Sequence, residues 1–213
     1  MTFAIGAAAV AAVLLAIVAS VGVRVYNVLV DLDQFAQNSF AQIQVQLKRR
    51  YDLIPNLAEA AKSFLTHERE TLEAVIAARQ SASSKLPAAG QTGDQASMQS
   101  WMGAESALTG ALGRFSMVIE AYPELKANET VSNLMEELTS TENRISYARQ
   151  LYNDSATNFN IRRRKFPAVL FAGAVGYSDD LLMIEFDDHT EIQSAPRVNL
   201  NENTEQPLAT AGV

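Results

Sequence analysis

The first feature of the hydrophobic pattern is an uninterrupted apolar stretch from Phe3 to Val23, which contains no charged side chain. A helix rises 1.5 Å per residue, so about 20 apolar residues cross the hydrocarbon core of a bilayer. The stretch contains one hydroxyl, that of Ser20, which can bond back to the preceding helical turn. The pattern therefore predicts a transmembrane helix over residues 3–23.

The sequence leaves two other interpretations of this stretch open. A signal peptide cleaved after about Ser20 would release a secreted helical adhesin, and a soluble core helix is the third interpretation. Signal peptides usually carry a basic region before a shorter apolar segment, whereas only Met1 and Thr2 precede this one. We therefore prefer a retained single-pass anchor. Arg24 follows the span directly, so the positive-inside bias predicts a short outer N-terminus and a cytoplasmic body.

Beyond Arg24, apolar residues recur at steps of three and four up to about residue 80, as at Val25, Leu29 and Leu32. This spacing is typical of an amphipathic helix. Pro55 is the only turn signal in the segment, and a proline inside a helix removes one backbone hydrogen bond and bends it. We expect one bent helix, or two nearly continuous ones, of about 55 residues that continues the membrane helix.

The rest of the apolar pattern predicts further helices separated by loops. Residues 81–97 have a loop composition, and helical patterns cover about 96–122 and the segment from Asn128, a suitable N-cap, to Pro167. A short helix is expected over residues 168–174. The fold class is therefore all-α: an N-terminal transmembrane helix continuous with a long antiparallel bundle of three long helices plus a short fourth.

Charge separates the bundle, residues 24–186, from the tail, residues 187–213. Residues 178–213 carry eight acidic side chains and one basic one, whereas the rest of the chain is balanced, so the net charge of -7 arises at the C-terminal end. Residues 178–195 are expected to form a short strand or a helical end that packs on the bundle. The tail beyond is acidic and polar, and we expect it to be disordered. This charge also argues against a nucleic-acid partner.

The residues that usually carry catalysis or bind metals are sparse. The chain has no cysteine and two widely separated histidines, His67 and His189, with no second ligand at metal-binding spacing. Glutamates such as Glu136 and Glu142 have no accompanying histidine or glycine-rich loop and are typical of a solvated face. We therefore expect no enzyme activity, cofactor or metal. The basic run Arg162–Lys165 suits a helix C-terminus, which we expect at the end remote from the membrane.

Several motifs together resemble the LemA family of bacterial membrane-anchored helical proteins. They are Tyr26-Asn27, the run RRYDLIPNL at residues 49–57, Tyr152-Asn153, Asn158-Phe159-Asn160, Phe166-Pro167 and Gly176-Tyr177. The resemblance covers about residues 1–186 and implies a helical bundle behind an N-terminal anchor with a very short external end. The molecular function of the family is unsettled, so the resemblance defines the fold more than the activity.

These motifs supply the candidate interaction or architectural residues. They are Tyr26, Asn27, Arg49, Arg50, Asp52, Pro55, Asn56, Tyr152, Asn153, Asn160, Phe166 and Pro167. Around Pro55 the bent helix could expose a polar docking surface. Alternatively, Arg50 and Asp52 pair with the helix that follows Asn128, and the two Tyr-Asn pairs are packing positions.

The leading functional hypothesis is a non-enzymatic, membrane-anchored scaffold or assembly protein that self-associates at the bacterial membrane. An extended amphipathic rod leaves apolar surface for neighbouring copies. The expected partners are the lipid bilayer, further copies of the chain and other membrane proteins. The alternative is an enzyme-associated factor or accessory subunit of a membrane protease or envelope-stress system, which would use Arg49, Arg50 and nearby carboxylates.

Overall fold

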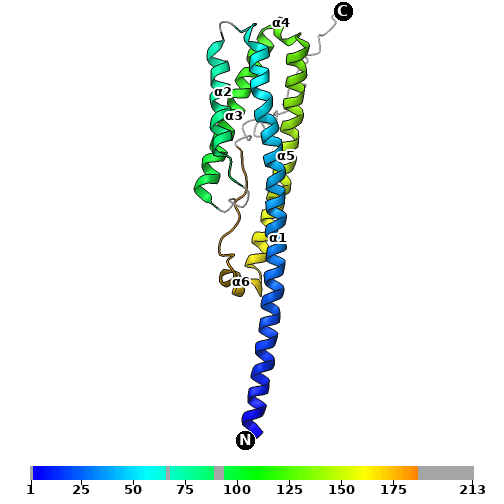
Figure 1. The fold of residues 1–213 in the computed structure, drawn as a ribbon, viewed down its shortest axis with the longest axis vertical. Coiled ribbons are helices and arrows are strands. Elements are labelled where there is room, and N and C mark those ends of the chain that lie inside the picture. The colour runs from blue at the N-terminus through cyan, green and yellow to red at the C-terminus, as the bar shows by residue number, and fades with distance from the viewer. Residues whose placement is uncertain (1, 66–67, 89–93, 187–213) are drawn as a thin grey trace, which may run out of the picture.

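The computed structural model describes residues 2–65, 68–88 and 94–186, and this part of the chain is all-α. Its long helices are α1 (Thr2–Lys62), α2 (Arg69–Lys85), α3 (Gln95–Ala121) and α5 (Glu129–Arg164). Shorter turns are α4 (Pro123–Lys126), α6 (Ala168–Phe171) and the 3-10 turn η1 (Gly173–Val175). The long helices form an elongated antiparallel bundle, from which the N-terminal part of α1 projects (Figure 1). The predicted fold class is confirmed.

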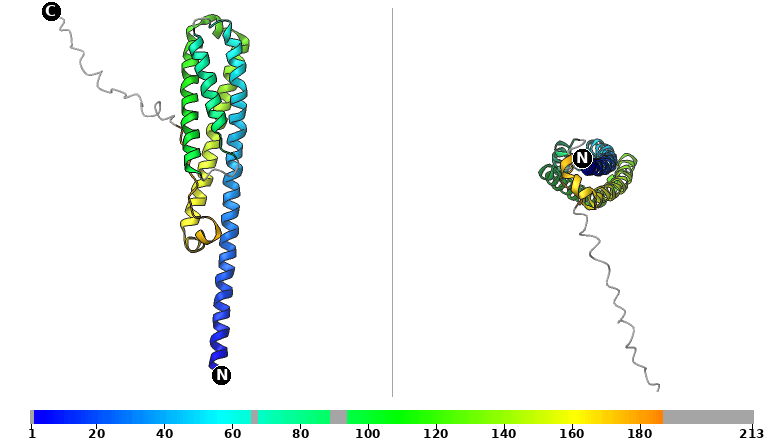
Figure 2. Two further views of the ribbon diagram at one scale, coloured as in Figure 1. Left: turned by 60° about the vertical axis from the view of Figure 1, so that its left-hand side comes forward. Right: turned by 90° about the horizontal axis from the view of Figure 1, so that it is seen from below.

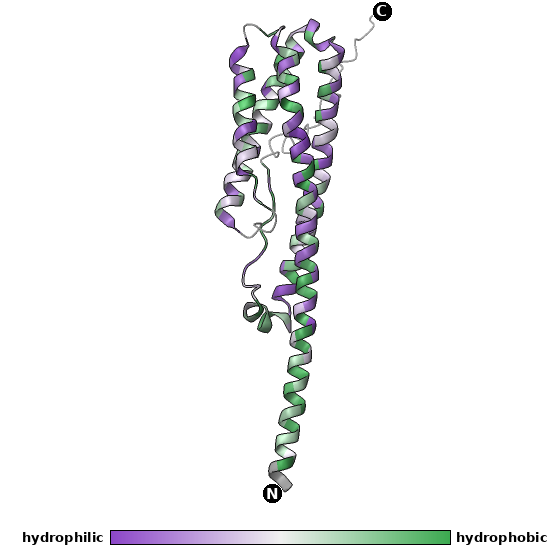
Figure 3. Ribbon diagram, in the orientation of Figure 1, coloured by the Kyte–Doolittle hydropathy of each residue, from purple (hydrophilic) through white to green (hydrophobic). Residues whose placement is uncertain are grey.

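The longest helix, α1, is a single helix of 61 residues with Pro55 inside it. Its N-terminal part is apolar along its whole length (Figure 3), and side chains such as Leu14 and Ile17 are exposed because no described residue covers them. Farther along, α1 buries one face of the bundle, including Ile43 and Leu47. By length and composition, α1 can cross a membrane, and its apolar part points to membrane association.

The prediction of one bent helix, or two nearly continuous ones, up to about residue 80 is wrong, because the chain reverses direction between the end of α1 at Lys62 and the start of α2 at Arg69. The backbone N–H groups of Phe64 and Leu65 both donate to the Ala61 carbonyl, at 3.0 and 3.1 Å, and close the last turn of α1. Leu65 is buried at this turn, and α2 then packs antiparallel to both α1 and α3. The described residues therefore contain four long helices, one more than predicted.

This extra reversal changes the direction of every later helix. Because α5 runs antiparallel to α1, it returns toward the projecting N-terminal part of α1 (Figures 1 and 2). The basic run Arg162–Lys165 therefore lies at the end of the bundle nearest the apolar segment, and the prediction that it lies at the remote end is wrong. Its place in the last turn of α5 agrees with the prediction, and cations there are favoured by the helix dipole.

The connections differ from the predicted ones in detail. α2 extends to Lys85 and α3 begins at Gln95, so the loop between them is shorter than residues 81–97. Asn128 caps α5 as predicted: its side-chain oxygen accepts from Val131 N at 3.1 Å. Residues 178–186 form neither a strand nor a helix but an extended segment along the bundle. The predicted disordered tail, residues 187–213, lies outside the described residues.

The bundle has a large core and a smaller cluster at the end next to the apolar segment of α1. In the large core, Phe40 packs edge-on against Trp101 and tilted against Tyr152, with ring centroids 5.8 and 5.6 Å apart. The smaller cluster joins α1, α5 and α6 through the buried residues Val25, Leu29, Phe159, Ala168 and Ala172. The α6 turn is therefore fixed against α1 just after the predicted membrane span.

Candidate functional site

A buried ionic cluster joins the helices α1, α3 and α5. Arg50 of α1 and Glu105 of α3 have side chains only 2% and 1% exposed, and Arg50 Nη2 forms an ion pair with Glu105 Oε2. Arg50 Nη1 also pairs with Glu142 Oε2 of α5 at 2.6 Å, and the Glu142 side chain is 46% exposed. One guanidinium on α1 therefore binds carboxylates from both α3 and α5.

The second oxygen of the Glu105 carboxylate is also hydrogen-bonded. Oε1 accepts from the hydroxyl of Tyr51 and from Trp101 Nε1, the latter at 3.1 Å. Burial raises the pKa of Glu105, while the positive charge of Arg50 and the two hydrogen bonds oppose that rise. Burial also lowers the pKa of Arg50, but the charges of Glu142 and Glu105 outweigh burial and the net direction is upward. Mutual neutralisation thus makes the burial of these charges tolerable.

A second polar site lies along α5, where two asparagines bind the backbone of the extended segment. The amide of Asn160 donates to the Leu181 carbonyl at 2.9 Å and accepts from Leu181 N at 2.8 Å. Asn153 makes the same pair of bonds to Ile184, at 3.0 and 2.8 Å. We call Asn153, Asn160 and the segment they bind, residues 178–186, the asparagine clasp.

The spacing of the clasp follows from helix and strand geometry. Seven residues of helix between Asn153 and Asn160 rise about 10.5 Å. Three residues of extended chain between Leu181 and Ile184 cover nearly the same length, about 10 Å. The segment runs antiparallel to α5, so the second asparagine in the sequence binds the first of the two backbone positions. One face of a helix can therefore provide hydrogen-bond partners for the backbone of an extended segment at regular intervals.

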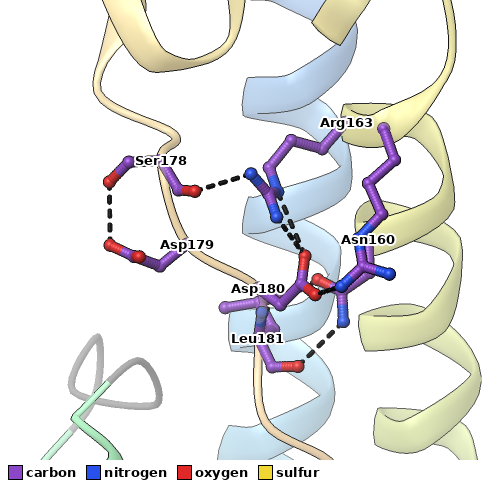
Figure 4. A network of polar contacts seen from close by, with 7 residues as sticks. Asn160, Arg163, Ser178, Asp179, Asp180 and Leu181 are labelled. Carbon is purple, nitrogen blue, oxygen red and sulfur yellow. Dashed lines mark hydrogen bonds and ion pairs between the residues drawn. The ribbon is translucent and has the colours of Figure 1, made fainter.

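Both ends of the clasp are reinforced. At its start, Arg163 and Arg164 of α5 form ion pairs with Asp180, and Arg163 Nη1 donates to the Ser178 carbonyl at 2.6 Å (Figure 4). At its other end, Ile184 and Phe186 are buried in the core, and the Phe186 ring packs edge-on against Trp101 at 5.5 Å. Tyr152 donates its hydroxyl to the Leu182 carbonyl at 2.9 Å.

The structure separates the sequence-predicted residues into distinct environments. Arg50 lies in the ionic cluster, and Tyr152, Asn153 and Asn160 lie in the clasp. Arg49 pairs on the surface with Glu137 at 2.5 Å, and both side chains are partly exposed. The remaining candidates are Tyr26, Asn27, Asp52, Asn56 and Phe166, which are exposed, and Pro55 and Pro167, which are half-buried.

The two Tyr-Asn pairs are not equivalent, since Tyr26 is exposed and Tyr152 is fully buried. Phe166-Pro167 is a cis peptide bond at the start of α6. The predicted pairing of Arg50 with the helix after Asn128 is present, through Glu142.

Sequence reasoning missed Glu105, Trp101 and Asp180. Glu105 had a visible signal, because it lies on the apolar stripe of its helix between Ala104 and Leu108. An acid in such a position is rarely buried without a partner. Asp180 had no comparable signal, since its partners on α5 are 16 and 17 residues away in the sequence.

Both sites are suited to holding elements together. Each Glu105 oxygen is already engaged by Arg50 or by Tyr51 and Trp101, and the clasp asparagines are engaged by backbone on both amide atoms. Within residues 2–65, 68–88 and 94–186, no group of three or more histidines or acids is placed to hold a metal ion.

Comparison with known proteins gives a consistent identification. Residues 39–200 match the LemA family. Magnetosome protein MamQ of Magnetospirillum gryphiswaldense is 27% identical over 168 residues, which cover 71% of this chain and 62% of that protein. Magnetosome protein MamQ 2 of Paramagnetospirillum magneticum is 29% identical over 168 residues, which again cover 71% of this chain and 62% of that protein. The chain therefore spans 62% of the length of these relatives. The family match covers well over half of the sequence, so this chain belongs to the LemA family.

Proposed function

We propose that this chain is a single-pass, membrane-anchored helical scaffold that self-associates at the bacterial membrane and is not an enzyme. The observation that carries the proposal is the continuity of α1, in which one helix contains both the apolar segment and one wall of the bundle. A helix of 61 residues is about 90 Å long. An anchor without a hinge would hold the bundle upright at a fixed height above the bilayer, as a scaffold requires.

The proposed orientation has the N-terminus outside and the bundle in the cytoplasm. Its support is the concentration of positive charge at the end of the bundle next to the apolar segment. Arg24 lies there on α1, and the return of α5 adds the run Arg162–Lys165. Basic residues that flank a membrane span favour the cytoplasmic side.

Self-association is supported by large apolar side chains exposed on the bundle itself. Phe35 and Val45 of α1 and Tyr147 of α5 are 53%, 60% and 73% exposed. The scaffold role also agrees with sites in which the polar groups bind one another, as in the ionic cluster and the clasp.

Crosslinking in intact membranes tests the scaffold proposal. The five lysines, Lys48, Lys62, Lys85, Lys126 and Lys165, are all exposed and are distributed along the rod, so an amine-reactive reagent samples its whole length. We expect covalent oligomers between two differently tagged copies, and a mass above the monomer in mild detergent. A monomer at every concentration, without crosslinks between the tagged copies, would refute self-association.

A further inference from the structure

We propose that the α6 turn is a membrane foot, a short apolar element that inserts into the bilayer interface beside α1. The foot consists of residues 165–172, between the end of α5 and η1. The proposal rests on the proposed membrane anchor, and it adds a second contact with the same bilayer. It assigns a lipid partner to Phe166 and to two neighbouring apolar side chains.

The first argument is the exposure of the foot. Ala168 and Ala172 turn inward and are buried against Val25, Leu29 and Phe159. The bulky residues of the same turn point outward: Phe166 is 78% exposed, Val169 54% and Leu170 67%. Small residues therefore face the protein while large apolar ones face outward, the reverse of the usual distribution on a water-soluble surface. An exposed apolar cluster of this kind marks a contact site.

The second argument is the height of the foot along α1. The apolar stretch Phe3–Val23 has 21 residues, a helical length of about 31 Å that matches the roughly 30 Å hydrocarbon core. Phe171 of α6 packs on Gly22, where an added Cβ would lie 3.5 Å from its ring. Gly22 is one residue from the end of the stretch. When the stretch spans the bilayer, α6 is held at the boundary between hydrocarbon and headgroups.

The third argument is the charge around the foot. Arg163 and Arg164 share the single carboxylate of Asp180, which offsets one of their two positive charges. Arg162 and Lys165 are exposed, and no ion pair joins either of them to another described residue. Apolar side chains beside exposed cations match the two layers of a membrane surface, acyl chains and phosphate headgroups. The chemistry therefore fits an anionic phospholipid interface.

Site-specific fluorescence in vesicles tests the foot. The chain has no cysteine, so single substitutions Phe166→Cys and Leu170→Cys label one position each with an environment-sensitive dye. Val13→Cys, inside the apolar stretch, reports on the anchor. Met117→Cys is the matched surface control, since Met117 is 64% exposed near the end of α3 farthest from the N-terminus. The vesicles contain phosphatidylcholine and phosphatidylglycerol, with and without brominated acyl chains, and circular dichroism verifies that each variant is folded.

We expect the brominated lipid to quench the labels at positions 166 and 170, less than at position 13 and clearly more than at position 117. We also expect Arg162→Gln combined with Lys165→Gln to reduce quenching at position 170 when phosphatidylglycerol is present, with little change in phosphatidylcholine alone. Quenching at 13 without quenching at 166 and 170 would refute the foot and leave the anchor intact. No quenching at 13 would refute the anchor, and the foot with it. Equal quenching at 117 would show that the bundle lies flat, and would also refute the foot.

Discussion

The ionic cluster and the asparagine clasp hold the bundle together by opposite chemistry. In the cluster, one buried cation joins α1, α3 and α5 through two carboxylates. In the clasp, neutral amides on α5 bind the backbone of a segment that has no regular structure of its own. The cluster connects elements that are already helices with satisfied backbones. The clasp provides hydrogen-bond partners for backbone groups of Leu181 and Ile184, which have no other such partner among the described residues.

This difference predicts different kinds of failure. A buried charge that loses its partner raises the energy of the whole folded state. An extended segment that loses its amide partners can instead open locally while the helices remain packed. The cluster should therefore control global unfolding, and the clasp should control the opening of residues 178–186.

The largest effect is expected for Arg50→Ala. The substitution leaves Glu105 buried without its cation, and breaking a buried ion pair in this way costs about 3–5 kcal/mol of unfolding free energy. Denaturant unfolding of the full chain in mild detergent, followed by circular dichroism, measures the loss.

The adjacent arginine is a matched control for this prediction. Arg49 pairs with Glu137 at the surface, where the two side chains are 49% and 39% exposed. Exposed pairs contribute about 0–1 kcal/mol, so Arg49→Ala should change the unfolding free energy little. Equal losses for the two substitutions would contradict the special role of the buried pair.

A smaller and more local effect is expected for Asn160→Ala. It removes both hydrogen bonds to Leu181, and leaving backbone groups unsatisfied costs about 1–3 kcal/mol. Hydrogen exchange should show faster exchange at Leu181, with the amides of α1 and α3 protected as before. Asn158→Ala, an exposed asparagine on the same helix, should alter exchange by less than about 0.5 kcal/mol. Acceleration throughout the bundle would mean that the clasp is part of the global core.

The comparison also shows what the sequence could and could not predict. The helical periodicity identified α3, α5 and the Asn128 cap, because these depend on neighbours three or four residues away. The reversal after Lys62 escaped detection because Ala61, Leu65 and Leu72 keep helical spacing across it. Both helices turn the same apolar stripe toward one core, so the stripe continues where the backbone does not.

The candidate site was predictable only in part for the same reason. The motifs contained Arg50, Tyr152, Asn153 and Asn160, but their partners lie 21 to 92 residues away in the sequence. The contacts that these four residues make depend on which distant segments the fold places beside them. The asparagine spacing of seven had a structural meaning that appeared only once the extended segment was located on α5.

The most subtle test of the comparison is pH, because the buried group at the centre of the cluster is a carboxylate, whereas the two asparagine amides of the clasp do not ionise. In the unfolded chain Glu105 ionises near its ordinary pKa of 4.5, and burial raises that pKa in the folded protein. The folded protein then binds this proton more tightly than the unfolded chain does. The stabilisation that results from proton binding at Glu105 is complete below pH 4.5 and is lost as the pH rises through the folded-state pKa. The unfolding free energy of the wild type minus that of Glu105→Gln should therefore fall with rising pH, by at most about 1.4 kcal/mol per pH unit.

The clasp supplies the control for this measurement, since neither Asn153 nor Asn160 titrates. The loss caused by Asn153→Ala, measured by denaturant unfolding or by exchange at Ile184, should therefore change little over the same pH series. A wild-type advantage over Glu105→Gln that grows with pH would show that attraction to Arg50 outweighs the burial of Glu105. The cluster and the clasp would then still differ in whether their loss unfolds the whole bundle or opens one segment. Burial of an ionised carboxylate would no longer be a net cost of the cluster.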